Sequence, residues 1–137
     1  MNKRPIVGIT MGDPAGNGAE ITVKALANPV VYENSRPIVI GDANCMEQAV
    51  KIVGQEGKIR IHAVKEVKDA CFEYGVIDVY DMGLVDMEKH IFGKVSKMCG
   101  EAASFTLHYA SVSFLPADIL RDLSCAKCDM PIFCKNK

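Results

Sequence analysis

The sequence predicts an α/β fold, a partial, doubly wound sheet of mainly parallel strands. Two observations indicate this fold. Short β-branched runs recur along the chain, and segments with helical spacing of apolar residues separate them. The run Ile38-Val39-Ile40 is apolar at every position, which is typical of a parallel strand buried on both faces. Because ligands of such sheets bind beyond the carboxyl ends of the strands, the loops there are the first candidates for a functional site.

The first of these loops follows a predicted strand at residues 6–10 and precedes a predicted helix at residues 19–26. It contains the candidate cofactor-binding residues, which are Gly12, Asp13, Gly16 and Gly18. Glycine lets the backbone approach a ligand, and the unpaired N–H groups of a helix start can receive an anion. Asp13 is expected to cap the helix, with a contact to a ligand hydroxyl as the alternative. A tight turn that binds nothing is the other interpretation of the loop.

Further strands are expected at residues 36–41, 58–64 and 76–82. The middle one of these three alternates apolar with polar side chains, which predicts one wet face and a position near a sheet edge. A loop at residues 83–86 follows the last strand. Because strands and helical segments alternate, the sheet is expected to be open and mainly parallel.

The helices have recognisable ends. Pro29 is expected to end the first helix, and a short connector should follow it. Asp42 or Asn44 can cap the second helix, which stops at Gly54. Ser96 can cap a third helix, with Cys99, Ala102 and Ala103 on one side. From Phe105 the helical spacing gives way to alternation, and residues 116–123 are expected to form a short amphipathic turn or two.

Composition limits the class of protein. The length of 137 residues fits one domain with a real core, and 49% hydrophobic content indicates a globular chain. The formal charge of −1 gives no electrostatic footprint for nucleic acid or for an anionic membrane surface. No apolar run could span a bilayer, and no signal peptide is recognisable. The six cysteines are therefore expected to be reduced thiols in the cytoplasm.

One family is similar to this chain across several motifs. Thr10 to Glu20 reads Thr-Met-Gly-Asp-Pro-Ala-Gly-Asn-Gly-Ala-Glu and resembles the opening signature of the 4-hydroxythreonine-4-phosphate dehydrogenases of pyridoxal phosphate biosynthesis. The resemblance continues in later motifs and covers residues 7 to about 103; these motifs are 36–42, 78–86, 92–96 and 100–103. Asn17 and Ala19 replace the usual isoleucine and proline, and neither change removes the anion-receiving geometry.

The resemblance implies a fold like the N-terminal part of isocitrate and isopropylmalate dehydrogenases. It also implies NAD-dependent oxidation of a phosphorylated four-carbon hydroxy acid, followed by decarboxylation. A divalent metal, held by histidines from both subunits of a homodimer, would stabilise the developing enolate. The related 4-phospho-threonate and erythronate dehydrogenases are close alternatives. A non-catalytic α/β module that binds phosphate is a further alternative.

The family's Thr-Ala-Pro-Ile-Asn-Lys segment, its substrate-binding His-Thr and its metal histidines have no counterpart in this sequence. No catalytic or metal-binding residue is therefore assigned, and the chain alone is expected to be inactive. Residues 1–103 are interpreted as an incomplete family-like domain from the N-terminal part of such an enzyme. Residues 104–137 are interpreted as a divergent tail or one read from a shifted frame.

Other clusters of reactive side chains have simpler interpretations. Cys125-x-x-Cys128 with Cys134 could hold a metal or form a redox pair, but incidental cysteines are the favoured interpretation. The three histidines show no ligand spacing on one element, and His62 is expected to be a solvated strand residue. Three aspartates resemble a carboxylate cluster, although turn chemistry explains them as well; they are Asp78, Asp81 and Asp86.

Overall fold

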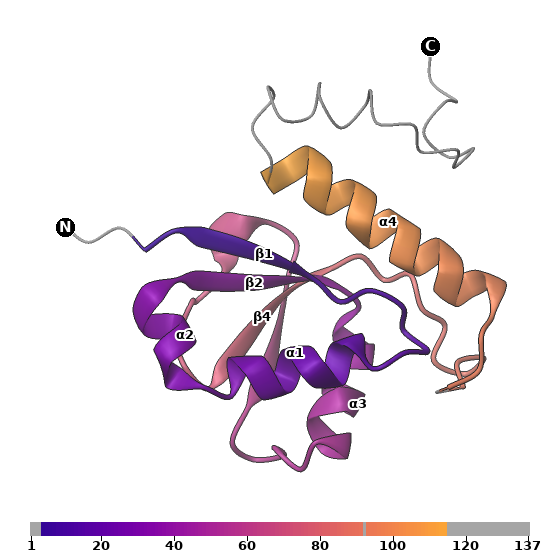
Figure 1. The fold of residues 1–137 in the computed structure, drawn as a ribbon, viewed down its shortest axis with the longest axis horizontal. Coiled ribbons are helices and arrows are strands. Elements are labelled where there is room, and N and C mark those ends of the chain that lie inside the picture. The colour runs from indigo at the N-terminus through magenta and orange to yellow at the C-terminus, as the bar shows by residue number, and fades with distance from the viewer. Residues whose placement is uncertain (1–3, 92, 115–137) are drawn as a thin grey trace.

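The computed structural model describes residues 4–91 and 93–114, without the side chains of residues 111–114. Strands and helices alternate along the chain (Figure 1). In order, the elements are β1 (Ile6–Thr10), α1 (Gly18–Leu26), α2 (Pro29–Asn34), β2 (Arg36–Gly41), α3 (Ala43–Ile52), β3 (Arg60–Val64), the 3-10 turn η1 (Val67–Asp69), β4 (Val76–Asp81) and α4 (Lys97–Phe114). Within the described ranges, no helix has the length and apolar content needed to cross a membrane.

The strands form one sheet in which every neighbouring pair is parallel, in the order β1-β2-β4-β3. This arrangement confirms the predicted α/β class. The last strand, β4, lies between β2 and β3, so β3 is at an edge of the sheet, as its alternating sequence predicts. All the carboxyl ends of the strands therefore meet along one edge, where the candidate loops lie.

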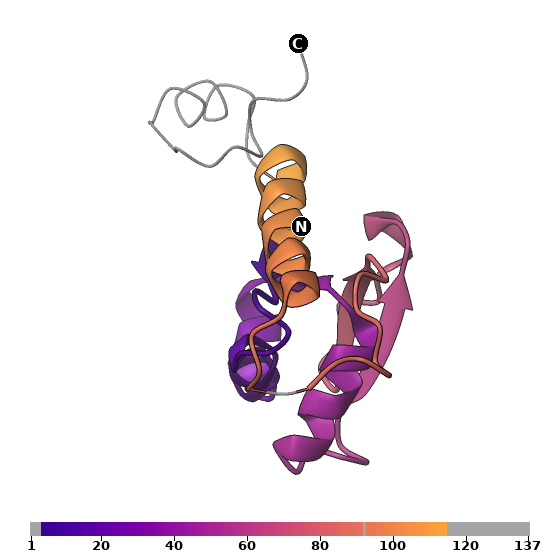
Figure 2. The ribbon, with the colours of Figure 1, turned by 90° about the vertical axis from the view of Figure 1, so that its right-hand side faces the viewer.

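Helices cover both faces of the sheet. On one face Val39, Ile77 and Val79 belong to a core shared with apolar residues of α1 and α3. On the other face Ile38 and Ile40 are fully buried. The helix α4 lies on that face, across the sheet from α1, in the two orthogonal views (Figures 1 and 2).

The ring of Tyr80 on β4 stacks on Tyr109 of α4, with centroids 4.5 Å apart. This contact confirms which face of β4 looks toward α4. Asp78 lies two residues earlier on the same strand, so it shares this face with Tyr80. The face therefore contains one buried carboxylate.

Two predicted segments differ from the structure. The expected connector after Pro29 is the helix α2, because Pro29 occupies its first turn and the Asn28 side chain accepts the N–H of Val30 at 3.1 Å. The expected change of pattern at Phe105 is wrong, since α4 continues unbroken through it. Phe105 and Leu107 are more than half exposed while Thr106 between them is buried, so their alternation reflects helix faces rather than a strand.

The predicted caps of the second and third helices are confirmed. The Asp42 side chain caps α3, and the Ser96 hydroxyl accepts the N–H of Cys99 at 3.3 Å in the first turn of α4. Cys125, Cys128, Cys134 and the expected turn at residues 116–123 lie outside the described residues.

Candidate functional site

The loop after β1 is packed against the next strand through Met11. The N–H of Met11 donates to the Ile40 carbonyl at 3.0 Å, and its side chain is buried. A methyl group on Gly18 would overlap the Met11 carbonyl oxygen, and one on Gly41 would lie 2.6 Å from the Met11 Cβ. Gly18 and Gly41 are therefore needed for close packing around Met11. For Gly18, this is a structural reason for glycine that the sequence pattern did not separate from ligand binding.

The other candidate residues of the loop lie at its surface. Gly12 has a φ of +77°, a conformation that favours glycine, and no atom would contact a side chain added there. Asp13 and Gly16 are exposed. Gly12, Asp13 and Gly16 therefore present backbone and one carboxylate to solvent beside the start of α1.

Asp13 does not cap α1, which corrects the expected role. Its Oδ1 accepts the N–H of Ala15 at 2.8 Å, and its carbonyl accepts the N–H of Gly16 at 3.0 Å, so both bonds stay inside the loop. The N-cap residue is Asn17, whose side chain makes no cap hydrogen bond with any part of the chain that the structure describes. The first-turn N–H groups of α1 have no intrahelical acceptor. The start of α1 can therefore accept an anion.

The start of α3, which follows the neighbouring strand β2, is occupied by the side chain of Asp42. Asp42 is buried, and its Oδ1 accepts the N–H groups of Asn44 at 2.9 Å and Cys45 at 3.2 Å. Its Oδ2 accepts the N–H of Val85 at 3.2 Å, from the loop after β4. This carboxylate therefore neutralises the helix start and holds a second loop against it.

Asp81 ties the ends of three strands together. Its Oδ1 accepts N–H groups of Ala43 at 3.2 Å and Gly83 at 3.3 Å. The Lys65 ammonium, just after β3, donates to the Asp81 carbonyl at 2.7 Å and lies 3.4 Å from its Oδ2. The carboxylates at this edge thus already serve backbone and lysine donors.

Known proteins resemble this chain in sequence and in structure. No family model matches the chain. A protein of Symbiobacterium thermophilum named as a D-threonate 4-phosphate dehydrogenase is 41% identical over 103 residues, which are 75% of this chain and 30% of that protein. One of the same name from Halalkalibacterium halodurans is 38% identical over 110 residues, 80% of this chain and 32% of the relative.

Solved structures agree. The crystal structure of a 4-hydroxythreonine-4-phosphate dehydrogenase from Burkholderia phymatum matches with a TM-score of 0.75 and 43% identity. That match covers 81% of this chain and 33% of the solved chain. The chain is homologous to the 4-hydroxythreonine-4-phosphate and D-threonate 4-phosphate dehydrogenases.

This homology confirms the resemblance inferred from the motifs of the sequence. A second solved 4-hydroxythreonine-4-phosphate dehydrogenase, from Klebsiella pneumoniae, matches with a TM-score of 0.69 and 26% identity, over 80% of this chain and 33% of that one. The chain spans about 30% of the length of the dehydrogenases that it matches in sequence.

The three aspartates of the suspected carboxylate cluster do not converge. Asp78 is buried in the middle of β4, Asp81 serves the strand ends, and Asp86 pairs with Lys89 at 2.9 Å. The hydrogen bond from Lys89 lowers the pKa of Asp86, which is exposed. Turn and loop chemistry therefore accounts for Asp81 and Asp86 in this dehydrogenase homologue.

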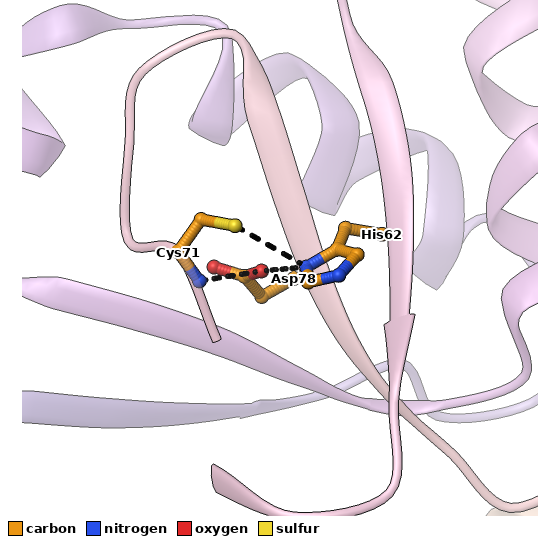
Figure 3. A group of neighbouring side chains, drawn as sticks. All are labelled: His62, Cys71 and Asp78. Atoms are coloured by element: carbon orange, nitrogen blue, oxygen red, sulfur yellow. Dashed lines mark hydrogen bonds and ion pairs between the residues drawn. The ribbon is translucent and has the colours of Figure 1, made fainter. Parts of the chain in front are cut away.

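Sequence reasoning missed the partner of His62. His62 is not simply solvated, because its Nδ1 lies 2.7 Å from Asp78 Oδ1 and its side chain is only 35% exposed. Cys71 lies beside both residues (Figure 3). Among the described residues, this is the one group of three potential metal ligands. The two residues meet because β3 pairs with β4 in this register. The sequence contains no signal for that pairing.

Proposed function

We propose that this chain is part of an NAD-dependent and divalent-metal-dependent dehydrogenase that oxidises and decarboxylates 4-hydroxythreonine 4-phosphate. The observation that carries the proposal is the 43% identity, at a TM-score of 0.75, to a solved 4-hydroxythreonine-4-phosphate dehydrogenase. The names of the sequence relatives support D-threonate 4-phosphate as an alternative substrate. Erythronate 4-phosphate is a further alternative. All three carry a phosphate ester.

In this proposal the chain contributes a site for a phosphate group. The uncapped start of α1 offers backbone N–H groups and the positive end of the helix dipole. The half-buried Gly12, where an added side chain would meet no neighbour, and the exposed Gly16 leave room for a ligand beside it. The phosphate of the substrate or the pyrophosphate of NAD could bind at this helix start. When bound, NAD would supply the hydride acceptor of the reaction.

The described residues at the edge where the carboxyl ends of the strands meet do not fit the metal of the proposed reaction. Among the described residues, this edge contains no group of three potential metal ligands. His62, the histidine of the ligand group, lies in the middle of β3 rather than at the edge. No step of the reaction is therefore assigned to a metal held by these residues, and the chain alone is expected to be inactive.

Ligand binding tests the phosphate site. Titration calorimetry with 4-hydroxythreonine 4-phosphate and D-threonate 4-phosphate should show binding that the unphosphorylated compounds lack. Asn17→Asp places a negative charge at the start of α1 and should weaken binding at least tenfold. Asn44→Asp is the matched control, since it adds the same charge at the filled start of α3 and should change binding less than twofold. Equal effects of the two variants would contradict the site.

Turnover tests the remainder of the proposal. The purified chain with NAD, Mg²⁺ and either phosphorylated substrate should form no NADH; NADH formation would show that the chain suffices for catalysis. Phosphate-dependent binding without turnover also suits the alternative of a non-catalytic phosphate-binding module. The two proposals differ because the dehydrogenase proposal alone requires selectivity for four-carbon acid phosphates over inorganic phosphate. We further propose a homodimer, which sedimentation equilibrium tests.

A further inference from the structure

Three side chains with metal-binding atoms meet on the face of the sheet that looks toward α4. His62 and Asp78 are direct register partners on β3 and β4. Cys71 comes from the loop between η1 and β4, which crosses this face (Figure 3). The His62 Nδ1 lies 2.7 Å from Asp78 Oδ1 and 3.5 Å from Cys71 Sγ. All three potential ligand atoms lie within 4.8 Å of one another.

The backbone holds this group in place. Asp78 accepts the N–H of Cys71 on Oδ1 at 3.0 Å and the N–H of Phe72 on Oδ2 at 2.7 Å, and its side chain is fully buried. Phe72 has a φ of +54°, the one positive value for a residue other than glycine in the described chain. This strained turn aims two consecutive N–H groups at Asp78. The backbone of Cys71 is thereby held beside Asp78.

We propose that His62, Cys71 and Asp78 bind a divalent cation of the zinc class. Imidazole nitrogen, thiolate sulfur and carboxylate oxygen are the three ligand types that zinc takes in proteins. A thiolate and a carboxylate balance the two positive charges of the ion. The exposed Cys71 gives the ion a path from solvent and leaves the fourth position to water.

The distances suit a tetrahedral site. Zinc bonds of ~2.3 Å to sulfur and ~2.05 Å to nitrogen place those two atoms ~3.5 Å apart at the tetrahedral angle. This matches the separation of Cys71 Sγ and His62 Nδ1, which is 3.5 Å. The nitrogen and the carboxylate oxygen, now in hydrogen-bond contact, must separate by ~0.6 Å.

Binding replaces protons by the ion. The Cys71 thiol releases its proton, and the His62 ring presents Nδ1 without a proton while Nε2 carries one. The two backbone N–H groups on Asp78 remain, and they orient the carboxylate as outer-sphere donors usually do. The bound ion would fasten the loop between η1 and β4 to the edge strand β3.

This site is separate from the one in the proposed dehydrogenase function. It lies at the middle of β3 and β4, on a face of the sheet, whereas the phosphate site lies at the carboxyl edge. The proposal therefore does not depend on the substrate, and its test needs no turnover.

Cobalt binding tests the proposal, because a thiolate ligand gives Co²⁺ a charge-transfer absorption in the near ultraviolet. The tail cysteines could also bind cobalt, so the full chain is used with Cys125→Ser, Cys128→Ser and Cys134→Ser as the common background. We expect one equivalent of Co²⁺ with this absorption, which Zn²⁺ displaces. Adding Cys71→Ser should abolish the absorption, and adding His62→Gln should weaken cobalt binding at least tenfold.

The exposed Glu73 supplies the matched control. Glu73→Gln removes a nearby negative charge without touching the three ligands and should change the cobalt affinity less than twofold. Zn²⁺ should also raise the Tm of the background chain and leave the Tm of its Cys71→Ser variant unchanged. An absorption that persists in Cys71→Ser, or its absence from the background chain at excess Co²⁺, would overturn the proposal.

Discussion

Two helices begin side by side at the carboxyl edge of the sheet, and their starts differ. At α3 the buried Asp42 occupies the helix start and also binds the loop after β4. At α1 the N-cap residue Asn17 makes no side-chain cap bond within the described ranges. One start is closed by the protein's own carboxylate, while the other has no side-chain cap and is the start that we propose as the phosphate site. Two similar βα turns can therefore differ in whether the protein itself fills the helix start.

At the start of α1, Gly18 has no space for a larger side chain. Gly18→Ala should lower the free energy of unfolding by more than about 3 kcal/mol, because its methyl group would overlap the Met11 carbonyl. Urea unfolding measures the loss. Gly100→Ala is the matched control, since the added methyl has no neighbour within 4 Å beyond its adjacent residues and its own helix backbone, and α4 should gain about 0.5–1 kcal/mol. Equal effects at Gly18 and Gly100 would contradict the packing around Met11.

Removing the cap of α3 should have the next largest effect. Asp42→Ala leaves the N–H groups of Asn44, Cys45 and Val85 without their acceptor, and should cost about 2 kcal/mol. Asp42→Asn keeps one acceptor oxygen and should lose about half as much. Thermal unfolding checks both variants. If Asp42→Ala is as stable as the parent, the start of α3 is not held by this carboxylate.

The same carboxylate affects a thiol in the first turn of α3. A helix start usually lowers the pKa of a cysteine, but burial and then the neighbouring Asp42 raise the pKa of Cys45 to about 12. This is above its unfolded value, so the stability it contributes is complete below pH 9 and is lost as pH rises from 9 toward 12.

In the parent chain, ionisation of Cys45 should lower the free energy of unfolding by about 1 kcal/mol for each pH unit. The Cys45→Ala variant should lack this contribution, so its free energy of unfolding should fall less steeply with pH. Urea unfolding between pH 9 and 10 is the best measurement, because Tyr32, whose pKa burial also raises to about 12, ionises in the unfolded chain only near pH 10. Identical slopes for the two proteins would contradict the raised pKa of Cys45.

The smallest effect is expected at the open helix start. Asn17→Ala removes no cap bond and should change the free energy of unfolding by less than about 0.5 kcal/mol. Compared with Asp42→Ala in the same urea assay, it measures the asymmetry between the two starts directly. A loss above about 1 kcal/mol would show that Asn17 caps α1 in solution.

The predictable parts of the fold have strong local signals. Ile38, Val39 and Ile40 are fully buried, as an uninterrupted β-branched run between two helical segments predicts. Asp42 caps α3 because an acidic residue directly after a buried strand is a local feature of the sequence. Each of these depends on contacts close in sequence or on burial from both faces.

The missed features depend on tertiary arrangement. His62 and Asp78 meet only because β4 enters the sheet beside β3, sixteen residues later in the chain. Asp13 bonds within its loop because Asn17, four residues on, occupies the cap position. Gly18 resembled a ligand-binding glycine, although the Met11 carbonyl beneath it decides its identity. Patterns of residue type do not show which of several nearby residues a side chain contacts in the folded chain.

The insertion of β4 between β2 and β3 has a consequence for how the chain folds. The first two strands can pair once residue 41 has left the ribosome, since they are neighbours in the sheet. The third strand has no strand partner until β4 is synthesised and enters the gap beside it. Such non-local pairing slows folding and leaves a strand open to foreign partners in the meantime. During synthesis, residues 60–64 therefore stay without a strand partner until residues 76–81 have followed them.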